Sequence, residues 1–128
     1  MSHLHPLFAA LRDRRPIAAS VSPGMRDWTH ADDIGEGIAA LLAAGRLRHD
    51  VYNLSRGVGV AGTRVLEMFR DAGADIRLTE DPAQAELRFD AQAGRPPMAI
   101  GRLAEDTGFR ASRDLRDAIA RVASGGTI

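Results

Sequence analysis

The fold of this chain is decided by two stretches, RDWTHADDIGEGIAALL at residues 26–42 and VYNLSRGVG at residues 51–59. In the first stretch, apolar residues recur at the spacing of one helix face: Ile34, Ile38, Leu41 and Leu42. Asp32 or Asp33 is expected to cap the start of this helix, and Gly45 to end it. The first stretch therefore predicts an amphipathic helix that follows a polar lead-in.

Hydrophobic spacing and turn residues predict the other elements. They are helices at residues 4–14, 63–72, 100–107 and 112–123, and strands at 17–21, 51–54, 76–78 and 87–89. Thr63 and Ser112 are expected to cap two of the helices. A length of 128 residues leaves room for one domain, residues 1–128. The predicted fold class is mixed α/β, a small partial domain with short strands and about five helices.

Composition narrows the chemistry. The formal net charge is zero, and all 17 basic residues are Arg, spread along the chain. The absence of Lys excludes a Schiff-base or phosphate-loop lysine, and no basic patch indicates nucleic acid binding. The absence of Cys excludes disulfides and Cys-based zinc sites. With no apolar run of membrane length and no signal-peptide core, no membrane partner is expected and the predicted location is cytoplasmic.

No catalytic residue and no metal site is predicted. The single tyrosine, Tyr52, is followed four residues later by Arg56, whose guanidinium stays protonated and cannot pass on a proton. We therefore interpret Tyr52 as a strand aromatic. His3 and His5 have a spacing typical of metal ligands on a strand, but the pattern around them is helical and no third ligand is indicated.

The Arg-Asp-aromatic-x-His-x-x-Asp run at residues 26–33 and the Tyr-Asn-Leu strand after it resemble a segment of the NAD-dependent epimerase/dehydratases. These are extended short-chain dehydrogenase/reductases that act on nucleotide-sugars. The resemblance implies the C-terminal, substrate-side portion of that fold. The family's N-terminal Rossmann half, with its glycine-rich turn and catalytic Tyr-x-x-x-Lys pair, has no counterpart in this sequence. We therefore expect a truncated gene product or a fragment without isomerase or oxidoreductase activity of its own.

The resemblance also implies site residues and partners. Arg26 and Arg95 match arginines that often hold the substrate's diphosphate, so the expected ligand is a sugar or nucleotide-sugar. NAD would be bound by the missing half of the intact enzyme, and no cofactor is expected to bind this chain alone. Removal of that half would leave the helix faces at Leu4, Phe8 and Leu11 or at residues 34–41 uncovered. We therefore expect a homo-oligomer, domain-swapped through the N-terminal helix, or a separate N-terminal Rossmann partner.

One alternative comes from another class of protein. Gly57, Gly59 and Gly62 form a literal G-x-G-x-x-G between a predicted strand and a predicted helix, and Glu80 lies where a ribose-binding acid is expected. This pattern is typical of a dinucleotide-binding turn. It keeps open the hypothesis of a small stand-alone nucleotide- or partner-binding module.

Overall fold

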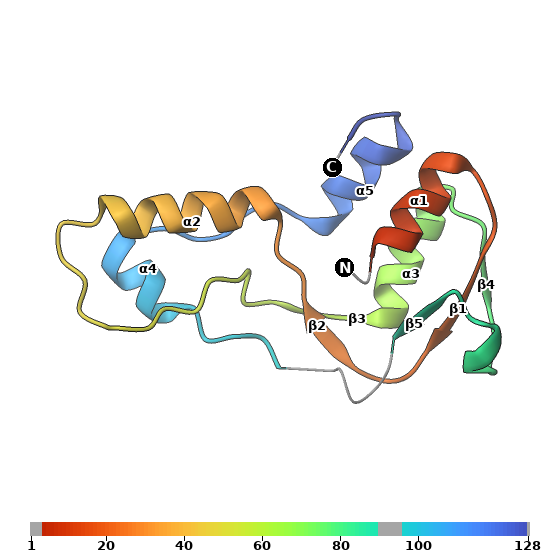
Figure 1. Ribbon diagram of the computed structural model, residues 1–128, viewed down its shortest axis with the longest axis horizontal. Coiled ribbons are helices and arrows are strands. Elements are labelled where there is room, and N and C mark those ends of the chain that lie inside the picture. The colour runs from red at the N-terminus through yellow and green to blue at the C-terminus, as the bar shows by residue number, and fades with distance from the viewer. Residues whose placement is uncertain (1–3, 90–95, 128) are drawn as a thin grey trace.

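The computed structural model describes residues 4–89 and 96–127, and Figure 1 shows that they form an elongated molecule. In chain order the elements are α1 (His5–Asp13), β1 (Ile17–Val21), β2 (Met25–Asp27), α2 (Ala31–Ala43), β3 (Gly59–Ala61), α3 (Gly62–Asp71), β4 (Ile76–Leu78), η1 (Pro82–Gln84), β5 (Leu87–Phe89), α4 (Gly101–Thr107) and α5 (Leu115–Ala123). One end of the molecule holds α2 and α4, and the other holds the larger sheet with α1, α3 and α5 (Figure 1).

Two small sheets organise the chain. In the three-stranded sheet β1 lies between β4 and β5, and both neighbours run parallel to it. In the two-stranded sheet β2 pairs with β3 in antiparallel orientation, with Asp27 opposite Gly59. Parallel strands need a crossover connection, and here α3 connects the β2–β3 pair to β4.

The hydrophobic core lies at the end of the molecule that holds the larger sheet. Its fully buried side chains come from α1, β1, α3 and α5 and include Leu7, Ile17, Leu66, Phe69 and Ile119. The rings of Phe8 and Phe69 meet edge to face, with 4.9 Å between their centroids. The helix face at Leu4, Phe8 and Leu11, which was expected to be uncovered, is buried in this core, so that expectation was wrong.

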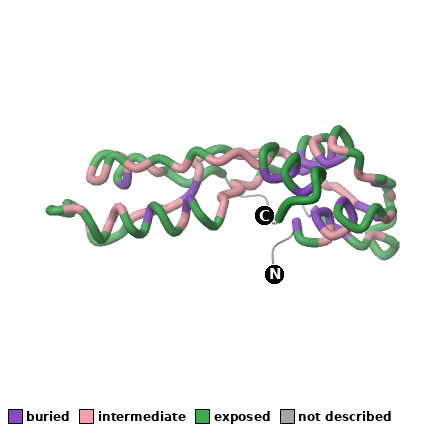
Figure 2. Tube along the Cα trace, turned by 90° about the horizontal axis from the view of Figure 1, so that it is seen from above, coloured by how far each residue is buried: buried purple, intermediate pink, exposed green. Residues whose placement is uncertain are grey.

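The end formed by α2 and α4 is much less covered (Figure 2). Within α2 only Asp33 and Gly37 are buried, whereas Ile38 is 48% and Leu42 83% exposed. Gly37 lies against Leu54, since a Cβ at this glycine would stand only 2.6 Å from Leu54 Cδ1. Apart from that contact side, the apolar residues of α2 have little cover from the described part of the chain.

Most predicted elements are confirmed: the five helices, and the strands at residues 17–21, 76–78 and 87–89. The predicted strand at residues 51–54 is wrong. That segment has no strand beside it in the described residues, and side chains hold it instead. The Tyr52 hydroxyl donates to Asp106 Oδ2 at 2.6 Å and accepts from the backbone N–H of His49.

Those contacts also make Asp106 an anchor of α4. Hydrogen bonds from the Tyr52 hydroxyl and the Arg48 backbone lower the pKa of Asp106 to about 2. The carboxylate therefore stays ionised at neutral pH and fixes residues 48–52 to α4.

The predicted helix caps are also wrong. His30 caps α2 by accepting from the Asp32 N–H through Nδ1 at 3.1 Å, and α2 ends at Ala43, before Gly45. The residue before α3 is Ala61, with no side-chain cap, in place of a cap by Thr63. Asp114, and not Ser112, caps α5 by accepting from the Arg116 N–H at 2.8 Å. His30 caps α2 and Asp114 caps α5. The side chain of Asp33 is therefore available for another contact.

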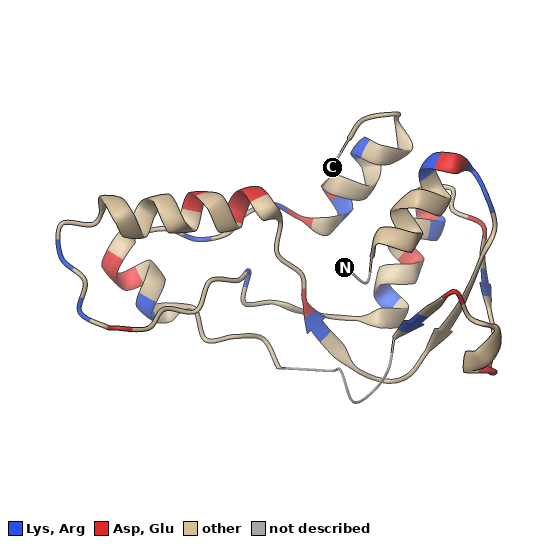
Figure 3. Cartoon of the chain, viewed as in Figure 1, with Lys and Arg blue, Asp and Glu red and all other residues tan. Residues whose placement is uncertain are grey.

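Asp33 joins the two ends of the molecule. Its side chain is 1% exposed and accepts from the Arg113 backbone N–H at 3.0 Å and from Arg113 Nη1 at 2.7 Å. In Figure 3 the acidic start of α2 lies beside the segment that leads into α5. Burial raises the pKa of Asp33, but the hydrogen bonds from Arg113 outweigh it, and the pKa lies below its usual value. This pair therefore stabilises the fold above the unfolded-state pKa of Asp33, and the contribution is lost as the pH falls through the folded-state value.

None of the helices in residues 4–89 and 96–127 is long and apolar enough to cross a membrane.

We predict that Arg113→Ala will destabilise the chain by about 3 kcal/mol, because it removes the charged partner of the buried Asp33 carboxylate and leaves only the backbone N–H bond. The matched control is Arg12→Ala, which breaks an ion pair whose side chains are 65% and 47% exposed. The control should change the free energy of unfolding by less than about 1 kcal/mol. Urea denaturation measures both variants, and equal effects would show that Asp33 does not depend on Arg113.

Candidate functional site

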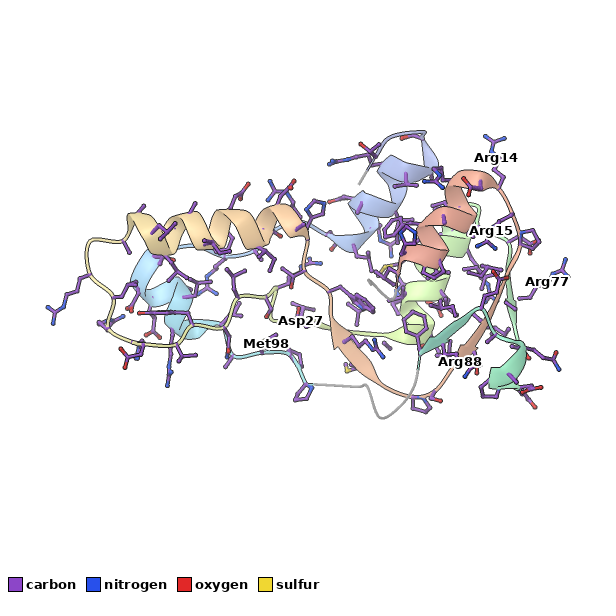
Figure 4. The ribbon with its side chains drawn as sticks, in the orientation of Figure 1. Arg14, Arg15, Asp27, Arg77, Arg88 and Met98 are labelled. Carbon is purple, nitrogen blue, oxygen red and sulfur yellow. The ribbon has the colours of Figure 1, made fainter. Side chains whose placement is uncertain are left out.

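Residues 26–30 form a short segment in which most side chains serve the fold. The Asp27 carboxylate, labelled in Figure 4, accepts from the Gly57 N–H at 2.9 Å. The Thr29 hydroxyl accepts from the Arg56 N–H at 3.0 Å, and His30 caps α2. These bonds tie the segment to residues 56–57 and orient the β2–β3 pair.

Arg26 is the exception in this segment. It lies on β2 opposite Val60, with its guanidinium carbon 6.0 Å from the centre of the Trp28 ring. Most other arginines of the site region are paired, as Arg56 is with Asp114 at 2.8 Å, but among the described residues no carboxylate pairs with Arg26. A guanidinium over an aromatic face keeps its donors available for an anion.

Trp28 stands between Arg26 and the core. Its ring meets Phe89 edge to face at 6.3 Å, and it also lines a hollow of about 330 Å³ between α1 and the start of α5. The indole Nε1 is buried and has no hydrogen-bond partner within the described residues. A buried donor without an acceptor costs about 1–3 kcal/mol, so this nitrogen is an unsatisfied polar atom in a residue that lines the hollow.

The hollow beside Trp28 has an apolar wall and a polar rim. Leu4, Phe8 and Ala118 are among its wall residues, and Thr29 and Asp114 are among its polar ones. Its size falls in the range of small-molecule sites, which are typically apolar with a few polar groups. Arg26, Trp28 and this hollow form the candidate site.

The second predicted site residue, Arg95, lies outside the described residues, so its convergence with Arg26 remains a prediction. Sequence reasoning missed Trp28 as a site residue. The available signal was that the chain's single tryptophan lies two positions after Arg26, within the same motif. In the described residues no group of three or more His, Asp or Glu side chains converges as a metal site would.

The glycine motif builds the β2–β3 pair. Gly57 has a φ of 74°, and its N–H donates to Asp27 and to the Ser55 hydroxyl. Gly59 lies within β3, and the Gly62 N–H points at the Gly24 carbonyl at 3.4 Å. A pyrophosphate would need such N–H groups unpaired at the start of a helix. In this conformation the N–H groups of Gly57 and Gly62 already have partners within the protein, and the spacing of the motif alone could not tell whether the glycines follow a strand or form one.

We predict that Gly57→Ala will destabilise the chain by about 1–2 kcal/mol, because alanine is strained at this left-handed position. Its Cβ would also stand 2.9 Å from Ile100 Cδ1. The control is Gly59→Ala, at a position without positive φ, where the cost is limited to a Cβ that would stand 3.2 Å from Pro97 Cγ, so its effect should be smaller. Thermal denaturation with an NAD titration checks both. A loss of NAD affinity at unchanged melting temperature would favour the stand-alone nucleotide-binding module.

Comparison with solved structures shows where this arrangement occurs. The chain superposes on UDP-glucuronic acid 4-epimerase from Bacillus cereus, in complex with UDP-glucuronic acid and NAD, with a TM-score of 0.72 and 15% identity over 96% of this chain. It superposes on RMD from Pseudomonas aeruginosa, complexed with NADPH, with a TM-score of 0.69 and 17% identity over 97% of this chain. For DesIV, a dTDP-glucose 4,6-dehydratase from Streptomyces venezuelae with NAD and TYD bound, the TM-score is 0.65 and the identity 23% over 96% of this chain.

The chain spans 38%, 43% and 37% of the lengths of these three proteins. No protein-family model and no curated protein matches the sequence. The expected fold class, a mixed α/β partial domain, is confirmed. The chain has the fold of one portion, about two fifths, of the NAD-dependent epimerases and dehydratases of the extended short-chain dehydrogenase group.

Proposed function

We propose that this chain is the substrate-side portion of an NAD-dependent sugar or nucleotide-sugar epimerase/dehydratase, working in the cytoplasm and inactive alone. Two independent features support the proposal. The motif at residues 26–33 resembles that family, and the fold matches proteins whose structures contain NAD or NADPH. NAD would bind to the portion of the enzyme that this chain does not contain.

The observation that carries the proposal is the state of Arg26. Within the motif, the side chains of Asp27, Thr29 and His30 accept hydrogen bonds from backbone N–H groups and so stabilise the fold. Arg26, in contrast, has no carboxylate partner among the described residues. A planar guanidinium meets phosphate oxygens with two parallel hydrogen bonds, so Arg26 suits a diphosphate. In our proposal Arg95 provides a second contact with the same group.

The hollow beside Trp28 would then take a neighbouring part of the substrate. Its wall is apolar, and the buried indole N–H offers one donor in need of an acceptor. A sugar or base presents an apolar face together with oxygen acceptors, which matches that pairing. The chain's role is therefore to hold the substrate and to exclude water from it.

In our proposal the catalytic residues of the enzyme lie outside this chain. Tyr52 is the chain's single tyrosine, and burial together with its hydrogen bond to Asp106 raises the pKa of its hydroxyl. A raised pKa makes Tyr52 a poor proton acceptor at neutral pH. We therefore assign no catalytic residue to this chain.

We predict that Arg26→Ala will raise the KM for a nucleotide-sugar once activity has been obtained with the missing portion supplied in trans. The lost charge-assisted contact is worth about 1.5–3 kcal/mol, or about 10-fold to 150-fold. Steady-state kinetics checks this, with the exposed Arg102→Ala on α4 as the control with unchanged KM. Unchanged kinetics in Arg26→Ala would mean that the substrate lacks a diphosphate or that Arg26 is structural.

We propose that a partner binds at the exposed apolar face of α2. Ile38 and Leu42 are exposed on α2, and Leu47 and Val51 follow on the segment after it. In the intact enzyme we propose that the missing Rossmann portion covers this face, whether it belongs to the same or another chain. In its absence a second copy is the available cover, because exposed apolar patches favour association.

We predict that the 128-residue chain alone self-associates and that Leu42→Glu shifts it toward monomer, because Leu42 is 83% exposed. Light scattering on dilute protein measures the mass. The control is Leu78→Glu at the far end, where Leu78 is 60% exposed but lies away from α2. A monodisperse wild-type monomer with a cooperative melt would remove the main physical argument for a missing portion.

A further inference from the structure

A second hollow lies on the other side of the larger sheet's carboxyl edge. Its volume is about 740 Å³, and its lining residues come from α3, the ends of β1 and β4, and the start of η1. Figure 1 shows where these elements lie. In open parallel α/β sheets ligands bind outside the carboxyl ends of the strands. Neither the candidate site at Arg26 nor the proposed function uses this hollow.

The hollow is lined by hydrogen-bonding side chains that the fold does not use. Ser20, Ser22 and Thr63 contribute hydroxyls, and Glu80 contributes a carboxylate. Within residues 4–89 and 96–127, none of these four side chains has a hydrogen-bond or ion-pair partner. Hydroxyls can both donate and accept, and an ionised carboxylate accepts from two donors at once, so the lining suits a ligand rich in hydroxyl groups.

The same hollow also has an apolar surface. Leu78 is 60% exposed at the end of β4, and Leu66 on α3 is 2% exposed beneath the lining. The exposed side chain of Leu78 can pack against the C–H groups of a ligand. A ligand with hydroxyls on its edge and C–H groups on its face would contact both kinds of surface.

The charged residues that line the hollow favour a neutral ligand. Arg64 pairs with Glu67 at 2.7 Å, whereas Arg70, whose Nη2 donates to the Ile76 carbonyl at 2.8 Å, keeps its positive charge in the lining. Glu80, which has no cationic partner among the described residues, contributes one negative charge. The two charges balance, so an anionic ligand gains no net attraction in this hollow, in contrast to the site at Arg26.

We propose that this hollow binds a neutral pyranose sugar, with Glu80 accepting from ring hydroxyls and Leu78 against the C–H face. The site is separate from Arg26, and the proposal does not depend on the proposed function. It would let the chain hold a neutral carbohydrate unit apart from any diphosphate-linked substrate.

The test is a titration of the isotopically labelled full chain with methyl α-D-glucopyranoside, followed by backbone amide NMR. We expect saturable shifts at residues 20–22, 63 and 79–80 at millimolar sugar. Glu80→Gln should weaken binding about tenfold, because it replaces a charge-assisted acceptor by a neutral one. Ser20→Ala is a second variant with a smaller expected loss, and Glu105→Gln on α4 is the control with unchanged affinity.

Glucuronate serves as the anionic comparison and should bind no more tightly than the neutral glycoside, because the charges of Arg70 and Glu80 balance. The absence of saturable shifts, tighter binding of glucuronate, or wild-type affinity in both Glu80→Gln and Ser20→Ala would overturn the proposal. Shifts confined to residues 26–28 would show that the sugar binds at the Arg26 site instead.

Discussion

The arrangement of this molecule depends on one buried carboxylate. Asp33 is 1% exposed, and the burial of a charge without a partner would be costly, so α2 can lie where it does only if Arg113 meets it. The two residues are 80 positions apart in the chain. Their contact fixes α2 relative to the start of α5, and through α5 it fixes the thinly covered end of the molecule to the end with the core.

Within the segment at residues 26–33, structural and binding roles fall to different side chains. Asp27, Thr29, His30 and Asp33 each satisfy a backbone N–H group or a buried partner. Trp28 packs against the core, and Arg26 is the charged residue of this segment for which the described part of the chain offers no ion-pair partner. Most of the polar side chains in this motif therefore connect two parts of the chain to each other and are not available to a ligand.

Hydrophobic periodicity predicted the helices and the three strands of the larger sheet, because burial of an apolar face leaves a local trace in the sequence. Pairing between segments leaves no such trace. Residues 51–54 have the composition of a strand, but the described part of the chain places no strand beside them. The strands β2 and β3 have three residues each, too few for a pattern. The partner of Asp33 could not be predicted for the same reason. Arg26 was proposed as a site residue from its motif, whereas Trp28 and the Glu80 hollow depend on contacts that only the fold creates.

The buried indole nitrogen of Trp28 has a consequence for the fluorescence of the protein. The chain contains one tryptophan, so its intrinsic emission comes from a single position beside Arg26 and the hollow between α1 and α5. The emission of an indole shifts with the polarity around its N–H, and this N–H is buried without an acceptor among the described residues. Any molecule that reaches the candidate site would change the colour or yield of that fluorescence. Tryptophan fluorescence can therefore report ligand binding at this site without an added label and without a signal from another tryptophan.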